Sequence, residues 1–203
     1  MKSILLCLCL GVSLMTFSQS FEVGPMLNLE RTTFTVPTGD IVIIVGGTGG
    51  GEDTRNTGYE SNIAFGGYFS YYPDGGFSDR LALSTELFYN ETSSTEFGDL
   101  SFSTISLIPY VSFSFFDDFP LFMGIGGGIA FVLDKPSFPQ ESFNDDIQNI
   151  DIPLKMMLAY RFEDIVTIEL GVHGSVTKVV KDEVARNSYY LGVKVPLNQL
   201  LKK

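Results

Sequence analysis

Residue types that could support hydrolysis lie within one short segment, in which Glu169 is followed by His173 and Ser175. Acyl transfer uses a hydroxyl nucleophile, a histidine base and a carboxylate that orients the base, so the three residue types are suitable. Their even spacing places all three side chains on one face if the segment is a strand. Whether they can reach a substrate depends on where that face points.

A larger group of ionisable residues lies on the strand faces that otherwise carry Gly, Ala, Ser and Thr. We expect six of them to form an ion-pair network in the interior: Glu86, Lys155, Arg161, Glu169, His173 and Lys194. Four further residues share this inward face: Glu22, Glu30, Arg80 and Asp151. Buried charges must be paired or hydrated, which favours a structural network, and a proton-linked or ion-conducting gate is the alternative.

The strands that would position these residues are indicated by alternation of apolar and polar side chains with a period of two. The clearest example is Val166 to Thr177, where Ile168, Leu170 and Val172 share one parity. Eight such strands are predicted: Phe21–Arg31, Tyr59–Tyr72, Arg80–Asn90, Ser101–Phe115, Leu121–Leu133, Ile150–Phe162, Ile165–Lys178 and Ser188–Leu197. Their length suits the roughly 9–11 residues that a tilted strand needs to cross a bilayer.

The apolar parity suits lipid on every strand, and tyrosines such as Tyr71, Tyr89 and Tyr189 fall near strand ends, where aromatic girdles are expected. The predicted fold is therefore all-β, an eight-stranded antiparallel up-and-down transmembrane β-barrel. A soluble barrel, a periplasmic lipocalin-like carrier, is the rival, but its apolar face would point inward. The small residues of the other parity fit the narrow lumen of an eight-stranded barrel, which is too narrow for a porin.

The first residues resemble an export signal, because Lys2 precedes an apolar run from Ile4 to Met15 and small residues follow. We expect residues 1–18 to be a cleaved signal peptide and residues 19–203 to form the outer-membrane barrel domain. Compact turns follow the second, fourth and sixth strands, and longer polar connections follow the others. By the convention of outer-membrane barrels the compact turns, and with them both termini, face the periplasm.

The chain is acidic, with a formal net charge of −11. Nucleic-acid binding is not expected, because it requires clustered Lys and Arg. No cofactor or metal site is expected either. The glycine-rich loop Val45–Gly51 lacks the Lys-Ser/Thr of a phosphate-binding loop and continues into Glu52 and Asp53, and the loop acids Asp145 and Asp146 have no EF-hand spacing.

Pairing of the sixth and seventh strands refines the interior. If inward residues face inward residues across that hairpin, Lys155 lies opposite Gly171 or His173 and therefore near His173 and Glu169. Lys194 can approach His173 and Glu169 as well, and Glu86 faces them across the lumen. The hydrolytic candidates would then point inward too. An enzyme that acts on membrane lipid needs its site on the outer wall, so we expect no enzymatic activity and keep a barrel-embedded lipid-modifying hydrolase, similar to lipid A deacylases with a His-x-Ser arrangement, as the alternative.

Short motifs along the predicted strands resemble the PorT-type outer-membrane β-barrel family of Bacteroidetes. The motifs are Thr85–Tyr89, Ser106–Tyr110, Gly124–Gly128, Leu158–Phe162 and Ile168–Gly171. The resemblance implies a small eight-stranded barrel at the cell surface, associated in some relatives with secretion, and implies no catalytic residues. The chain departs from many outer-membrane barrels in continuing past Leu197 to Lys203 instead of ending on an aromatic residue.

The sequence therefore predicts a small non-porin barrel that is a structural or protein-interaction component of the outer membrane. Its expected partners are outer-membrane lipid and an outer-membrane or periplasmic protein. Fold resemblance alone does not identify that protein.

Overall fold

The computed structural model of the 203-residue chain describes residues 20–37, 54–56, 58–73, 80–94, 100–116, 119–134, 148–162, 165–177 and 185–200. The predicted signal peptide, the glycine-rich loop and Asp145 and Asp146 lie outside these residues. The elements are β1 (Ser20–Pro37), β2 (Thr54–Asn56), β3 (Glu60–Tyr72), β4 (Leu81–Ser94), β5 (Leu100–Ser114), β6 (Leu121–Gly127), β7 (Ile129–Val132), β8 (Ile150–Asp151), β9 (Pro153–Phe162), β10 (Val166–Ser175), β11 (Ala185–Lys194) and α3 (Leu197–Leu200).

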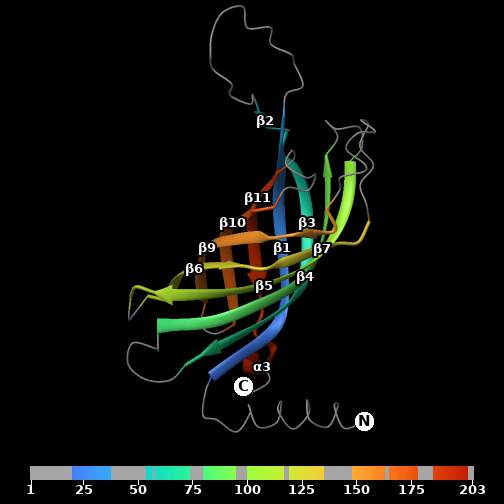
Figure 1. The fold of residues 1–203 in the computed structure, drawn as a ribbon. Coiled ribbons are helices and arrows are strands. Elements are labelled where there is room, and N and C mark those ends of the chain that lie inside the picture. The colour runs from blue at the N-terminus through green and yellow to red at the C-terminus, as the bar shows by residue number, and fades with distance from the viewer. Residues whose placement is uncertain are drawn as a thin grey trace, which may run out of the picture.

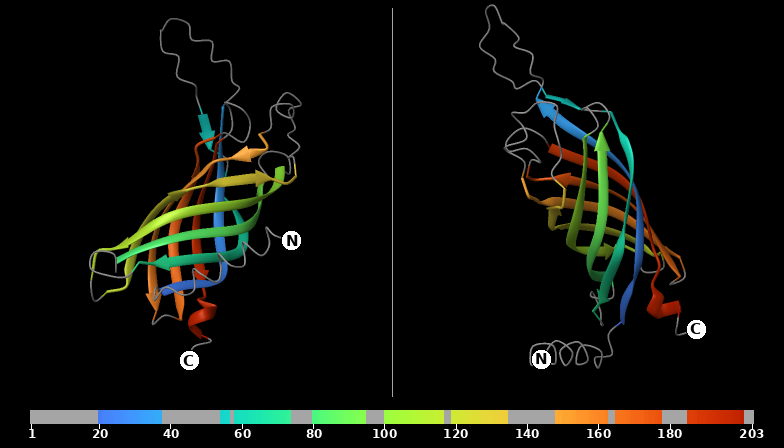
Figure 2. Two further views of the ribbon diagram at one scale, coloured as in Figure 1. Left: turned by 60° about the horizontal axis from the view of Figure 1, so that its bottom comes forward. Right: turned by 90° about the vertical axis from the view of Figure 1, so that its right-hand side faces the viewer.

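The strands close into a barrel in which every neighbour is antiparallel and follows in chain order (Figures 1 and 2). The closing pair is β1 with β11, whose register runs from Met26 opposite Lys194 to Thr35 opposite Ala185. β6 and β7 together make one wall strand, as do β8 and β9, and β2 pairs with the last three residues of β1. The predicted eight-stranded up-and-down barrel is confirmed.

Two ends of the barrel can be distinguished by the elements that they carry (Figure 1). At the end that carries β2, β1 ends at Pro37 and β5 begins at Leu100, and we call this end the β2 rim. The opposite end, where α3 follows β11, is the α3 rim. The described residues include no helix with the length and apolar character that a membrane crossing requires.

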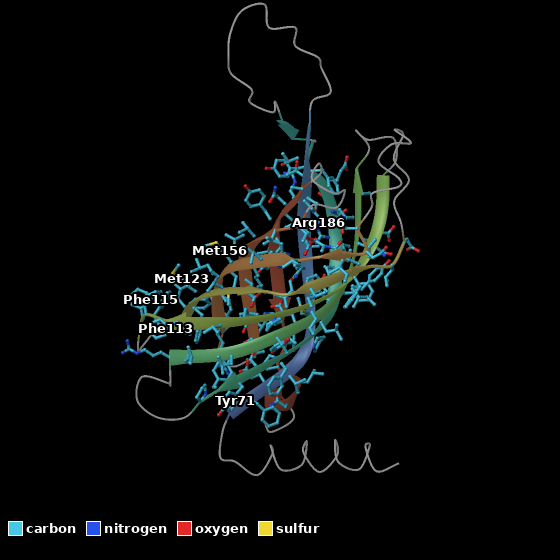
Figure 3. All side chains as sticks on the ribbon, viewed as in Figure 1. Tyr71, Phe113, Phe115, Met123, Met156 and Arg186 are labelled. Atoms are coloured by element: carbon cyan, nitrogen blue, oxygen red, sulfur yellow. The ribbon has the colours of Figure 1, made fainter. Side chains whose placement is uncertain are left out.

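Burial follows the alternation, but the apolar side chains are exposed and the polar ones are buried, which is the opposite of a soluble barrel. Outward Ile125 is 64% exposed and outward Leu170 is 62% exposed, whereas inward Glu86 and Lys155 are fully buried. Phe115, Met123 and Met156 likewise project from the outer wall (Figure 3). The outer surface is therefore an apolar belt, and the charged side chains lie inside.

Inward glycines make room for large rings in the lumen. A Cβ atom on Gly171 would lie 2.6 Å from two ring carbons of Tyr190, and a Cβ on Gly126 would lie 2.3 Å from the Cβ of Tyr110. Neither glycine can gain a side chain without moving its neighbour. The glycines thus allow two tyrosines to share the narrow interior of an eight-stranded barrel.

Two prolines explain why the two composite wall strands are interrupted. Gly127 is in register with Pro109, and Gly128 donates its N–H to the carbonyl of Pro153 at 2.9 Å. In an antiparallel ladder such a pair normally exchanges two hydrogen bonds, but proline has no N–H to return. We call these four residues, Pro109, Gly127, Gly128 and Pro153, the seam. The carbonyls of Gly127 and Gly128 receive no N–H from the opposite prolines, and the breaks between β6 and β7 and between β8 and β9 lie here.

The last strand begins and ends earlier than predicted. It runs from Ala185 to Lys194 instead of Ser188 to Leu197, because Pro196 cannot continue the ladder, and α3 follows. Asn198 ties α3 to the first strand: its side-chain carbonyl accepts the N–H of Val23 at 3.0 Å, and its amide donates to the carbonyl of Phe21 at 2.7 Å.

β4 and β5 extend beyond their predicted ends to Ser94 and from Leu100. The connection between them, residues 95–99, is therefore shorter than the one between β3 and β4, residues 73–80. The expected alternation of compact and long connections is wrong at this pair. The extra paired residues lengthen the wall at the β2 rim.

Candidate functional site

Four charged side chains meet at the centre of the lumen. Lys155 contacts Glu86 and lies 3.1 Å from Glu169, while Lys194 lies 2.5 Å from Glu86 and also contacts Glu169. Each ammonium group thus contacts both carboxylates, so the two positive and two negative charges form a neutral square. All four side chains are at most 3% exposed.

The square is surrounded by tyrosines. Lys194 donates to the hydroxyl of Tyr110 at 2.7 Å, and the Lys155 ammonium lies 4.4 Å from the centre of the Tyr110 ring. Tyr190 and Tyr68 lie 5.2 Å and 5.4 Å from Lys155 and Lys194, respectively. Cation–π attraction and the charge-assisted hydrogen bonds offset the hydration free energy that the lysine ammonium groups lose on burial.

A second layer lies on the α3 side of the square. Arg161 pairs with Glu22, and Tyr72 donates its hydroxyl hydrogen bond to the same carboxylate at 3.0 Å. The Arg161 guanidinium also lies 5.1 Å from the centre of the Tyr72 ring. This pair is partly open, since the Arg161 side chain is 18% exposed.

A third layer lies on the β2 side and contains the histidine. His173 Nδ1 lies 3.5 Å from Glu30 Oε1, and Glu30 also accepts a hydrogen bond from Asn90. The His173 ring stacks on both Phe88 and Tyr190, with ring centres 5.8 Å and 4.5 Å away. The imidazole is therefore held between two rings.

The fourth layer closes the lumen near the β2 rim. Asp151 accepts hydrogen bonds from Ser175 at 2.9 Å and from Thr177 at 2.8 Å, and pairs with Arg186 at 2.8 Å. These contacts join β8, β10 and β11. The layers stack acid–base pairs along the barrel axis, with side chains filling the cross-section between them.

Water has little room between these layers. A cavity of about 30 Å³ lies between the square and the Glu22–Arg161 pair, lined in part by Tyr68, Tyr110 and Glu169. A site of this size can hold a water molecule or two, but not a hydrated solute. This cavity is therefore too small for a cofactor or a substrate.

The structure brings four of the six predicted network residues together: Glu86, Lys155, Glu169 and Lys194. Arg161 and His173 lie in the neighbouring layers with other acids. Their strand positions explain the separation, because Arg161 is six residues from Lys155 along β9, about 20 Å in an extended strand. In register, Lys155 does lie opposite His173, one of the two predicted positions.

The remaining inward candidates also have specific places. Glu22, Glu30 and Asp151 are buried in the lumen layers described above, as the alternation predicts. Arg80 lies just before β4 at the α3 rim and is only partly buried.

The hydrolytic candidates have separate partners. Glu169 binds the two lysines, His173 lies against Glu30, and Ser175 donates to Asp151. A hydrolytic triad requires the serine to bond to the histidine, whereas the Ser175 hydroxyl donates to Asp151. Among the described residues there is also no group of three or more His, Cys, Asp or Glu that could hold a metal ion.

Sequence reasoning missed several residues that complete the lumen, among them Tyr110, Tyr190 and Arg186. Tyr190 shares its parity with Lys194, and Tyr110 alternates with outward Val111, so parity could have identified both. Arg186 was missed because the last strand was predicted to start at Ser188. Extending that strand toward the β2 rim would have revealed it.

The sequence matches no protein-family model and no curated protein. Solved structures with a similar course of the chain include Neisserial surface protein A, with 13% identity and a TM-score of 0.49 over 89% of this chain and 99% of that one. The attachment invasion locus protein Ail of Yersinia pestis has 9% identity and a TM-score of 0.48 over 86% and 97%. The outer membrane protein OprG from Pseudomonas aeruginosa has 10% identity and a TM-score of 0.34 over 86% and 94%.

Proposed function

We propose that this protein is a small outer-membrane β-barrel that conducts no solutes and serves as a structural or protein-interaction component of that membrane. The observation that carries the proposal is the inverted burial: Leu170 and Ile125 are exposed while Glu86 and Lys155 are fully buried. An apolar belt around a closed sheet satisfies the requirements of a bilayer, in which every backbone polar group must be paired within the protein.

The belt also argues against the two alternatives. A lipocalin-like carrier needs an apolar cavity, whereas the lumen here is filled by charged and aromatic side chains. A lipid-modifying hydrolase needs its acid, base and nucleophile in contact on a surface that lipid reaches, whereas Glu169, His173 and Ser175 have separate partners. The filled lumen supports a non-porin role as well.

A matched pair of substitutions tests the membrane assignment. Leu170→Arg places a charge in the middle of the belt and should lower barrel stability in lipid by about 2–4 kcal/mol, whereas Ser61→Arg, near the β2 rim, should cost about 0–1 kcal/mol. The readout is the fraction that migrates as a compact band on a gel before boiling, across a urea series. Equal effects of the two substitutions, or a native protein that is soluble without detergent, would refute the assignment.

Planar-bilayer recording tests the closed lumen. The reconstituted native barrel should give no steady ion conductance, because the paired lysine and glutamate side chains and Tyr190 fill its cross-section. A double variant with Lys155→Ala and Glu86→Ala removes two side chains from the lumen and keeps the square neutral, so it should introduce an ion conductance. Conductance by the native protein would contradict the non-porin role and favour the ion-conducting gate.

The interaction role is supported by the part of the wall that continues past the belt. After outward Leu29, the outward residues of β1 become polar with Arg31, Thr33 and Thr35, and β2 pairs with the end of β1. A photo-crosslinker at Thr35 should capture a protein partner in intact outer membranes in addition to any bound lipid, and one at Leu170 should capture only lipid. The absence of a captured protein at Thr35 would remove the interaction part of the proposal.

An association with secretion is the finer part of the proposal and derives from the resemblance to PorT-type barrels. Deleting the protein and measuring the set of secreted proteins tests it directly. Unchanged secretion would remove this part and leave the membrane assignment untouched.

A further inference from the structure

A pocket of about 330 Å³ lies at the β2 rim, lined in part by Thr33, Thr35, Tyr59, Asn187 and Tyr189. Thr33, Thr35, Asn187 and Tyr189 have the outward parity of their strands, which the exposed Leu29 and Leu191 share, and Thr33 is itself buried. Tyr59 directly precedes β3. The pocket therefore opens on the outer wall, and its lining also includes the inward residues His173 and Ser188. Gly174, which also lines it, has no side chain to fill the hollow between the outward Val172 and Val176.

The pocket lies where the outer wall changes character. Along β1 the outward series is apolar up to Leu29 and polar from Arg31 onward, and along β11 Asn187 precedes Tyr189 and Leu191. Such a change is expected where hydrocarbon gives way to headgroups. A molecule in the pocket would thus contact both acyl chains and water.

Arg31 gives this boundary a positive charge. It is in register with Tyr189, and its guanidinium lies 5.5 Å from the centre of the Tyr59 ring, so two residues of the pocket flank it. Among the described outward positions of β1, β3, β10 and β11 it is the single charged residue. An anionic ligand would complement the positive charge of Arg31 at this boundary.

The other polar groups of the pocket suit the same ligand. The hydroxyl groups of Tyr59 and Tyr189 are hydrogen-bonded to each other in the pocket, and the exposed amide of Asn187 is a further hydrogen-bond donor. Arginine with neutral donors around it is a common arrangement for phosphate recognition. The pocket volume is at the lower end of the range for small-molecule sites, which fits a headgroup instead of a whole lipid.

We propose that this pocket binds the phosphate headgroup of an anionic lipid in the leaflet at the β2 rim, with Arg31 as the residue that contacts the phosphate. The acyl chains of the bound lipid lie on the belt below, along Leu29, Leu191 and Val172. The proposal rests on the proposed function, because it needs a barrel that spans a membrane.

Native mass spectrometry of the full chain in a non-ionic maltoside detergent tests the proposal with defined lipids. Dimyristoylphosphatidylglycerol should bind at one site, and dimyristoylglycerol, which has the same chains without phosphate, should not. Arg31→Gln should weaken phosphatidylglycerol binding about tenfold, the usual effect of losing a charge-assisted hydrogen bond. Arg80→Gln, at the opposite rim, is the matched control and should leave binding unchanged.

A second variant and a competitor complete the test. Gly174→Leu fills the pocket without altering charge and should also weaken binding. Equal binding of the two lipids, equal effects of Arg31→Gln and Arg80→Gln, or complete displacement of the lipid by an equal concentration of inorganic phosphate would each overturn the proposal. A native protein that gives no compact band before boiling would refute the membrane assignment itself, so the two failures are distinguishable.

Discussion

Gly171 and Tyr190 face each other across the ladder between β10 and β11, and a Cβ atom on Gly171 would lie 2.6 Å from the tyrosine ring. The same atom would also lie 2.6 Å from the backbone carbonyl oxygen of Met156, so the ring cannot relieve the clash alone. Tyr190 in turn stacks on His173 and lies beside Lys155. One missing side chain therefore determines how two lumen layers pack.

Gly171→Ala should destabilise the barrel by about 1–3 kcal/mol, the usual cost of overpacking a filled interior. The measurement is the urea midpoint of the compact band on unboiled gels. Gly174→Ala in the same strand is the control, because its Cβ would meet nothing closer than 3.4 Å. Equal midpoints for the two variants would show that Tyr190 can move away freely.

Glu86→Gln should destabilise the barrel strongly, by about 3–5 kcal/mol, because it leaves two buried lysines with one carboxylate. Adding Lys155→Met restores neutrality and should recover part of the loss. The free energy of unfolding is measured for the native barrel, the two single variants and the double variant. Together these four values give the coupling energy between Glu86 and Lys155. Additive losses would mean that the two residues act independently.

Asn198→Ala should loosen the start of β1, since the side chain holds the backbone of Phe21 and Val23. The expected loss is about 1–2 kcal/mol, with faster hydrogen exchange of the Val23 amide. Asn198→Asp keeps the acceptor for Val23 and loses the donor to Phe21, so it should protect Val23 but not restore full stability. Unchanged exchange in the alanine variant would show that α3 does not anchor β1.

Ser175→Ala should leave the acyl chains of lipid A unchanged, because Ser175 donates to Asp151 in the lumen and not to His173. Mass spectrometry of lipid A from cells with native or variant protein measures the outcome. Asp151→Ala removes the acceptor without touching the serine and serves as the comparison for any indirect effect on stability. A changed acyl pattern specific to Ser175→Ala would revive the hydrolase alternative.

The alternation of side chains predicts the fold well because a period of two assigns every residue of a strand to one face. It separates outward Leu170 from inward Glu169 without any knowledge of the neighbouring strands. It also predicts that Glu86, Lys155 and Lys194 share an interior. Burial in the structure follows that assignment.

Alternation does not predict the level along the barrel axis at which an inward side chain lies. His173 is four residues from Glu169 along β10, about 13 Å in an extended strand, so the two face the same lumen at different levels. The partner of His173 is Glu30, which reaches it through the closing pair of β1 with β11. That contact spans most of the chain, and local sequence carries no signal for it.

The seam of Pro109, Gly127, Gly128 and Pro153 has a mechanical consequence. The resistance of a β-barrel to radial strain comes from the ladders around its circumference, and here two neighbouring ladders each lack a rung at the same height. Thermal fluctuations of the wall should be raised there, on the side of the barrel where β5, β6 and β9 meet. The perimeter is therefore not uniformly stiff, because this side can widen more easily than a wall with complete ladders.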